Sequence, residues 1–208
     1  MWWRGILYLV VCYFLGAIPS AYLVCRFLKG VDLRTVGSKN VGATNCFRVA
    51  GPVPTIFVTV FDMGKGFAAV MLARGFGLSE PMPIFGGLVA VAGHVWPIWL
   101  GFRGGKAVLT GAGVFFALAW LPSLIAVASG VTVIAVTRYV SLGSITGAVV
   151  LPISLIVLSV TMRFRASIGV QVLGVMVGLL VIVLHHSNIK RLLGGAERKI
   201  GQKVDGTE

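Results

Sequence analysis

The stretch GILYLVVCYFLGAIPSAYLVC, residues 5–25, decides the fold class, because it runs for 21 residues without a charged side chain. An α-helix rises about 1.5 Å per residue, so this stretch is long enough to cross about 30 Å of hydrocarbon. It is longer than the apolar part of a signal peptide and lacks a small-x-small cleavage site. We therefore predict a retained membrane-spanning helix and, with it, an integral membrane protein.

Further apolar runs follow along the chain, at residues 53–73, 82–102, 107–137, 139–162 and 166–184. Hydrophobic residues make up 57% of the 208 residues and charged residues 12%, against about 25% charged residues in a typical soluble domain. No linker rich in Pro, Gly or Ser divides the chain, so we expect one membrane-embedded domain over residues 1–208. The three cysteines lack the paired spacing of a metal site or a disulfide framework, so no metal is predicted.

The run 107–137 holds 31 residues without a charge, with Pro122 near its middle, and is compatible with one crossing or two. Basic residues favour two, because cytoplasmic loops of membrane proteins are rich in Lys and Arg. With two crossings and an outside N-terminus, four of the 18 Lys and Arg residues lie outside: Arg4, Arg74, Arg163 and Arg165. With one crossing the cations divide almost evenly. We therefore predict an all-α protein with seven transmembrane helices, some of them short, and a cytoplasmic C-terminus.

The net charge of +12 is spread over loops between apolar runs rather than gathered in one block. This distribution agrees with the topology and argues against a nucleic-acid partner. It is also compatible with some of the cations binding anionic substrates.

The loop GSKNVGATNCFR, residues 37–48, is dense in glycine, hydroxyl and amide side chains between cationic ends. Glycines let backbone amides approach an anion closely, and hydroxyl and amide groups donate further hydrogen bonds. The same composition is also typical of an ordinary loop with many turns.

The second unusual stretch is GHVWPIWLGFRGGKAV, residues 93–108. We expect Gly104, Gly105 and Lys106 to open the next helix, where free backbone N–H groups and a lysine favour an anion. The GxxxxGK[ST] spacing of a P-loop is absent. His94, about three helical turns earlier, is predicted to be a packing histidine.

Two serines, Ser141 and Ser144, lie between apolar runs in RYVSLGSI, residues 138–145. They are expected either to cap a helix or to contact a ligand.

The tail contains HHSNIKRLLGGAERKIG, residues 185–201. His185 and Asn188 are three residues apart, so on a helix they share one face. Glu197 is the sole acid in this basic stretch. The alternative interpretation is a juxtamembrane anchor for anionic lipid.

Two charges fall inside an apolar run, Asp62 and Lys65, three residues apart. Charges at that depth normally pair or line a polar cavity. We expect a structural ion pair near the cytoplasmic end, with a role in substrate binding as the alternative.

Arg, Lys, Ser, Asn and Gly are the residue types that bind phosphate, so the residues alone predict a phosphorylated or otherwise anionic ligand at the cytoplasmic face. One rival interpretation is an organophosphate transporter. Such proteins often contain internal repeats around a midplane site, and no repeat is evident in this sequence. A lipid-binding scaffold, the other rival, would need the basic tail but not the glycine-rich loops.

Three stretches, taken in order, resemble the bacterial acyl-phosphate:glycerol-3-phosphate acyltransferase family. Residues 37–48 resemble its motif GSGNxGATNxxR, residues 93–110 its GHxxPxxxxFxGGKGxAT, and residues 185–197 its HxxNIxRLxxGxE. The resemblance covers nearly the whole chain, and three ordered motifs make it highly specific.

This resemblance implies a multi-pass enzyme of the bacterial cytoplasmic (inner) membrane whose active site faces the cytoplasm. Such an enzyme transfers a fatty acyl group from acyl phosphate to the 1-hydroxyl of sn-glycerol 3-phosphate. The product, lysophosphatidic acid, begins phospholipid synthesis. No cofactor is implied, the surrounding partner is membrane lipid, and a soluble enzyme supplies the acyl phosphate.

The resemblance also implies residue roles. His185, Asn188, Lys106 and Arg48 correspond to catalytic positions, with His185 or a substrate phosphate taking the proton. The implied substrate-binding residues are Ser38, Asn40, Thr44, Asn45, Gly104, Gly105, Ser141, Ser144 and Glu197.

The sequence departs from the family motifs at three positions. Lys39 and Ala107 stand where the family usually has glycine, and Leu109 stands where it has alanine. These differences bear on the backbone of the loops rather than on the activity, and a further cation at Lys39 suits an anion site.

Overall fold

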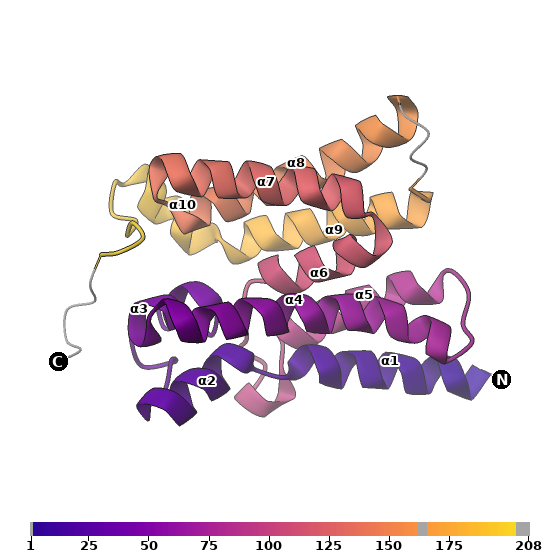
Figure 1. The fold of residues 1–208 in the computed structure, drawn as a ribbon, viewed down its shortest axis with the longest axis horizontal. Coiled ribbons are helices and arrows are strands. Elements are labelled where there is room, and N and C mark those ends of the chain that lie inside the picture. The colour runs from indigo at the N-terminus through magenta and orange to yellow at the C-terminus, as the bar shows by residue number, and fades with distance from the viewer. Residues whose placement is uncertain (1, 162–165, 203–208) are drawn as a thin grey trace.

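The computed structural model of the protein describes residues 2–161 and 166–202. Arg163, Arg165 and Lys203, which the topology prediction counts among the cations, lie outside the described residues. Over the described ranges every regular element is a helix, and most helices run along one long axis (Figure 1).

The helices follow one another along the chain, with the longest connection between α2 and α3 among the described residues. They are α1 (Trp2–Ala17), α2 (Ser20–Lys29), α3 (Ala43–Ala50), α4 (Pro52–Gly75), α5 (Met82–Val95), a 3₁₀ turn (Ile98–Leu100), α6 (Val108–Leu118), α7 (Trp120–Thr137), α8 (Val140–Thr161), α9 (Ile168–Leu184) and α10 (His186–Leu193). Among the described residues, 5 helical segments are long and apolar enough to cross a membrane, or up to 6 if the bent pair α9 and α10 is one span. The shorter apolar helix α6 comes in addition.

The predicted first span is present, since residues 2–29 are long and apolar enough to cross a membrane, but its helix is interrupted. Helix α1 ends at Ala17 and α2 begins at Ser20. Pro19 causes the break, because it has no N–H to donate and its ring obstructs the preceding turn. At the break, the carbonyl of Ile18 accepts hydrogen bonds from the Ser20 N–H at 3.1 Å and from Lys65 Nζ at 2.9 Å. The third apolar run is interrupted as well, since α5 ends before the separate 3₁₀ turn.

The long apolar run 107–137, for which two crossings are predicted, divides into two helices, of which α7 is long enough to cross a membrane and α6 is shorter. The division is uneven, with 11 residues in α6 and 18 in α7. At about 1.5 Å per residue, α6 is therefore only about 16 Å long. The break falls at Ala119, and Pro122 is the third residue of α7, where the missing N–H costs no helical hydrogen bond.

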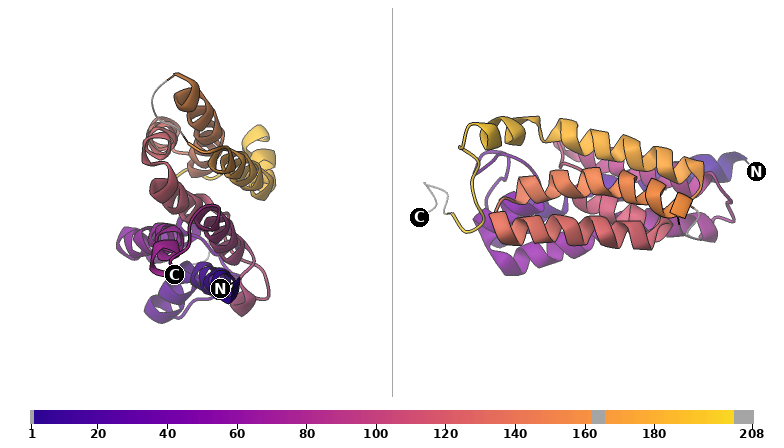
Figure 2. Two further views of the ribbon diagram at one scale, coloured as in Figure 1. Left: turned by 90° about the vertical axis from the view of Figure 1, so that its right-hand side faces the viewer. Right: turned by 90° about the horizontal axis from the view of Figure 1, so that it is seen from above.

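Helix α6 lies in the middle of the bundle, between the group formed by α1, α4 and α5 and the group formed by α7, α8 and α9 (Figure 2). Glycines bring α4 and α6 close together. A methyl group at Gly66 would collide with the Thr110 carbonyl, and one at Gly113 would collide with the Met63 carbonyl. Small residues allow such close approach between membrane helices. The position of α6, and of the loop that leads into it, is thereby fixed against α4.

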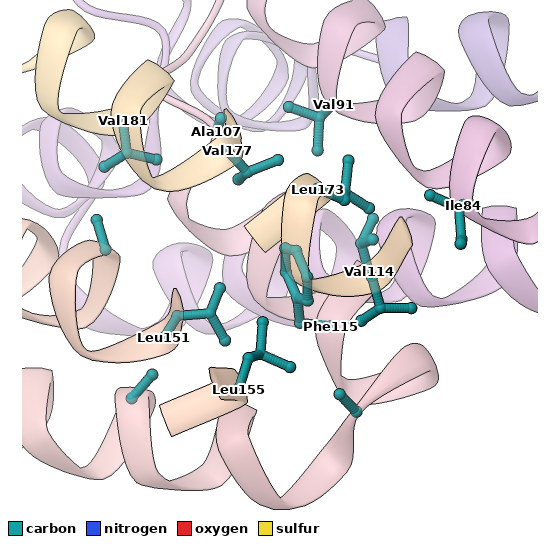
Figure 3. Packing of buried hydrophobic residues seen from close by; sticks show 14 of the residues in the cluster. Ile84, Val91, Ala107, Val114, Phe115, Leu151, Leu155, Leu173, Val177 and Val181 are labelled. Atoms are coloured by element: carbon teal, nitrogen blue, oxygen red, sulfur yellow. The ribbon is translucent and has the colours of Figure 1, made fainter. Parts of the chain in front are cut away.

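The largest hydrophobic core surrounds α6. Val114 and Phe115 of α6 are fully buried and lie among Leu155 of α8 and Leu173 of α9 (Figure 3). Because the same cluster includes side chains of α5, it joins the two helix groups.

Helices α2, α3 and α10 gather at one end of the bundle, opposite the N-terminus (Figure 1). The first-motif loop and the basic tail, which lie more than a hundred residues apart in the chain, therefore share that end.

At two positions this chain has another residue where the family motifs have glycine, and in both the backbone is left-handed. Lys39 has φ 57° and Ala107 has φ 64°. An L-residue pays about 1–2 kcal/mol for this conformation, whereas glycine adopts it freely. The family preference for glycine at these positions thus has a backbone cause.

Replacing Lys39 with glycine should stabilise the protein by about 1 kcal/mol, because glycine removes the left-handed strain of an exposed residue. The measurement is the melting temperature in detergent. Ser38→Gly is the matched control, because Ser38 is exposed in the same loop and is not among the residues with positive φ. A melting temperature that rises equally in both variants, or in neither, contradicts the explanation.

Candidate active site

A buried carboxylate, Glu197, holds together several polar side chains at the end of the bundle that contains α2, α3 and α10. Its Oε1 accepts hydrogen bonds from Ser141 Oγ at 2.7 Å and from Asn188 Nδ2 at 2.6 Å, and its Oε2 accepts one from Arg191 Nε at 2.7 Å. Burial raises the pKa of Glu197, but the hydrogen bonds from Asn188, Ser141 and Arg191, together with the charge of Arg191, hold it below its usual value. The ionised carboxylate therefore links α8, α10 and the tail.

Lys106 joins this group from the loop before α6, since its Nζ donates a hydrogen bond to Asn188 Oδ1. Burial, followed by the positive charge of Arg191, lowers the pKa of Lys106 to about 8. Lys106 is thus charged at neutral pH and loses its proton slightly above it. A half-buried ammonium of this kind is well suited to a phosphate ligand.

Arg48 of α3 is the third cation of the group. Burial lowers the pKa of Arg48, the carboxylate of Glu197 acts in the opposite direction, and the charges of Arg198 and Arg191 lower it further. Arg191 bonds to the Glu197 carboxylate, and the charge of that carboxylate also acts on Arg48 and Lys106, so positive charge is in excess at this end of the bundle. Such an arrangement binds anions through charge-assisted hydrogen bonds.

His185 lies at the 57° bend between α9 and α10 and is only 4% exposed. Its Nδ1 is 2.8 Å from the Val181 carbonyl oxygen. A carbonyl only accepts hydrogen bonds, so Nδ1 carries the proton and Nε2 keeps a lone pair in the neutral ring. His186 is exposed, with Nδ1 3.1 Å from the Val183 carbonyl. Only His185 of the two is placed inside the bundle.

The glycines of the second motif do not open a helix as predicted, because α6 begins at Val108. Gly104 N–H donates to the Val95 carbonyl at 2.9 Å, and Gly105 N–H donates to the His94 carbonyl at 3.1 Å. These amides are therefore engaged within the chain, and the loop folds back on the end of α5. The glycines bring the loop close to α5 and so set the position of Lys106.

Asn45 uses its side-chain amide within the first-motif loop. Its Nδ2 donates to the carbonyls of Leu33 and Val36, and its Oδ1 accepts the Ser38 N–H at 3.0 Å. Contact between Asn45 and a substrate would require these bonds to break, so in this structure Asn45 shapes the loop. Thr44 stands beside it in the first turn of α3.

Three further predicted residues differ in their placement. Ser38 is exposed in the loop, Asn40 is half-buried, and Ser144 donates through its hydroxyl to the Val140 carbonyl of its own helix at 2.9 Å. Of the two predicted serines, only Ser141 reaches Glu197. The structure adds Arg191, which the sequence interpretation left out although it occupies the arginine position of the third motif.

Comparison with known proteins agrees with these features. The family model described as glycerol-3-phosphate acyltransferase matches residues 6–195. A glycerol-3-phosphate acyltransferase of Parasynechococcus marenigrum is 46% identical over 200 residues, which cover 96% of this chain and 92% of the relative. One of Desulforamulus reducens is 42% identical over 198 residues, covering 95% and 96%.

Two solved structures of PlsY (YgiH), an integral membrane glycerol 3-phosphate acyltransferase, share this fold. The glycerol 3-phosphate form has a TM-score of 0.86 and 36% sequence identity, covering 95% of this chain and 96% of PlsY. The lysophosphatidic acid form has a TM-score of 0.83 and 35% identity, covering 95% of each chain. The predicted all-helical membrane fold is thereby confirmed. The chain belongs to the glycerol-3-phosphate acyltransferase family.

Proposed function

We propose that this glycerol-3-phosphate acyltransferase uses acyl phosphate as its donor and the 1-hydroxyl of sn-glycerol 3-phosphate as its acceptor. The products are lysophosphatidic acid and inorganic phosphate, and the reaction is the first step of phospholipid synthesis. The observation that carries the proposal is the cationic group around Glu197, since both substrates carry a phosphate. PlsY has the same fold and is known in a glycerol 3-phosphate form and a lysophosphatidic acid form.

The reaction needs little covalent assistance from the protein, because acyl phosphate is a mixed anhydride with an activated carbonyl. The acceptor hydroxyl oxygen forms a bond to the carbonyl carbon. The bond from that carbon to the phosphate oxygen then breaks, and phosphate leaves with the electron pair. The hydroxyl proton passes to a base. Most of the catalytic work is therefore orientation of two anions and stabilisation of developing charge.

The side chains divide this work between them. Arg48, Lys106 and Arg191 supply positive charge for the phosphate groups of the substrates, to which they can donate charge-assisted hydrogen bonds. Nε2 of His185 is the base in one route, and a phosphate oxygen of the substrate is the base in the other. Glu197 holds Ser141 and Asn188 in place for contact with the acceptor.

The proposed membrane arrangement has seven spans in a single domain over residues 1–208, in the bacterial cytoplasmic membrane. The N-terminus lies outside, and the end of the bundle with α2, α3 and α10 faces the cytoplasm. Support comes from the distribution of Lys and Arg, which cytoplasmic loops favour. The short helix α6 counts as one of the seven, shielded from lipid by its neighbours on both sides.

Cysteines introduced at Ser79 and Gln202 should be labelled from opposite sides of the membrane. Both positions are exposed, Ser79 in the connection between α4 and α5 and Gln202 in the tail. An impermeant thiol reagent added to intact cells should modify Ser79→Cys, and Gln202→Cys only after the membrane is opened. The native cysteines are buried. Labelling of both positions from one side refutes an odd number of spans.

Acyl phosphate should support turnover of the purified protein with glycerol 3-phosphate, whereas the matching acyl-CoA should not. The cationic group suits a donor whose reacting carbonyl carries a phosphate directly, as supplied by a soluble acyl-phosphate-forming enzyme. The assay detects lysophosphatidic acid, with both donors at the same chain length and concentration. Equal rates from the two donors would remove the basis for the proposed donor.

A further inference from the structure

A second polar cluster lies within the membrane-spanning part of the bundle, and the reaction described above makes no use of it. It consists of Ser20 from α2, Asp62 and Lys65 from α4, and His94 from α5, which we name the intramembrane cluster. The side chains of Lys65, Asp62 and His94 are only 1%, 2% and 9% exposed. The ion pair predicted between Asp62 and Lys65 is confirmed.

The intramembrane cluster fixes the break in the first span. Lys65 Nζ is 2.7 Å from Asp62 Oδ1 and 2.9 Å from the Ile18 carbonyl, which also accepts the Ser20 N–H at the break. Ser20 Oγ donates to the same carboxylate oxygen at 2.6 Å and so ties the first residue of α2 to α4. His94 Nδ1 lies 3.8 Å from that oxygen. The Asp62 carboxylate of α4 therefore has polar neighbours from α2, α4 and α5.

His94 connects the intramembrane cluster to the loop that contains Gly104, Gly105 and Lys106. Its carbonyl accepts the Gly105 N–H, while the carbonyl of Val95 accepts the Gly104 N–H. A methyl group at Gly105 would collide with the His94 ring, so the loop lies directly on that ring. A cavity of about 10 Å³, room for about one water molecule, lies at the junction and is lined by Ser20, His94 and both glycines.

Stability alone is a weak reason for such a cluster, because replacing a buried ion pair by apolar residues is often neutral or stabilising. A stronger reason for the cluster is that it fixes the geometry of neighbouring groups. Lys106 is such a neighbour, because it directly follows Gly105 in the loop that packs on His94. We propose that the intramembrane cluster is a positioning unit, which acts through His94 to hold the Gly104–Lys106 loop and direct the Lys106 ammonium toward the substrate phosphate. This inference rests on the proposed function of Lys106.

A double-mutant cycle between His94 and Lys106 tests the proposal. In the parent protein His94→Ala should lower kcat/KM by about 10-fold, since small displacements of a positioning group cost that much or more. In a Lys106→Ala background the same change should cost no more than about twofold, because a positioning residue has nothing left to position. Ser20→Ala, which leaves the ion pair intact, should show the same pattern with a smaller loss.

Ser123→Ala is the matched control, because Ser123 is also a buried serine but bonds to the Ala119 carbonyl at the start of α7. It should leave kcat/KM unchanged in both backgrounds, and all variants are compared by melting temperature. Equal losses from His94→Ala in both backgrounds would assign a purely structural role and overturn the proposal, as would no loss in the parent protein. If Lys106→Ala itself had no effect, the function proposed for Lys106 would fail, and this inference with it.

Discussion

Replacing His185 with alanine is expected to lower kcat by about 10²-fold to 10⁴-fold, the usual loss when a general base is removed. The reason is structural, because Nδ1 of His185 is committed to the Val181 carbonyl and only Nε2 remains to accept a proton. The measurement is the steady-state rate of lysophosphatidic acid formation at saturating concentrations of both substrates. We expect KM for either substrate to change much less than kcat.

The control for this variant is His186→Ala, because His186 is the adjacent histidine but is exposed. It should retain nearly normal turnover. If His186→Ala lost activity while His185→Ala kept it, the assignment of the third motif would be wrong by one residue. If neither variant lost activity, proton transfer to a substrate phosphate would replace His185 as the route.

Alanine at Lys106 or at Arg48 should lower kcat/KM by at least about 10-fold, because a hydrogen bond to a charged group contributes about 1.5–3 kcal/mol. Both residues belong to the group of cations around Glu197. The measurement is kcat/KM for acyl phosphate and, separately, for glycerol 3-phosphate. Near-normal values in both variants would mean that the substrate phosphates bind elsewhere.

Lys106 should also impose a pH dependence. Its pKa is lowered to about 8, so the ammonium charge is present at neutral pH and is lost as the pH rises through about 8. The kcat/KM of the parent protein should therefore fall above that pH. In Lys106→Arg the fall should move to higher pH, because an arginine remains charged. An unchanged alkaline limb in Lys106→Arg would assign that limb to another group.

The sequence predicted most of the spans because hydrophobicity is a local property. The runs 53–73 and 139–162 correspond closely to α4 and α8, and the charges around the run 107–137 predicted its two helices. The uneven division of that run was not predictable from charge alone, since the packing of α6 against α4 sets its position. The break at Pro19 was also missed, because the run was assigned from its lack of charged residues. The carbonyl of Ile18 at the break bonds to Lys65 of α4, a contact between helices that the run itself does not show.

For the residues of the site, too, the sequence predicts what depends on local spacing, and the tertiary structure decides what depends on contacts between helices. The motif residues and the pairing of Asp62 with Lys65 follow from short spacings along one helix, which the sequence displays directly. Which motif residues meet, and which merely shape a loop, depends on contacts between distant parts of the chain. Ser141 reaches Glu197 across 56 residues.

What the sequence determined by itself is the class of protein, its apolar spans and the motifs of its family, because each depends on residues close together in the chain. Only the tertiary structure decided that Lys106 bonds to Asn188, 82 residues away. Only the tertiary structure also committed the amides of Gly104 and Gly105 to α5 instead of to a ligand. The physical reason is that a hydrogen bond depends on distance and direction in space, and helix packing fixes both only when the bundle is assembled.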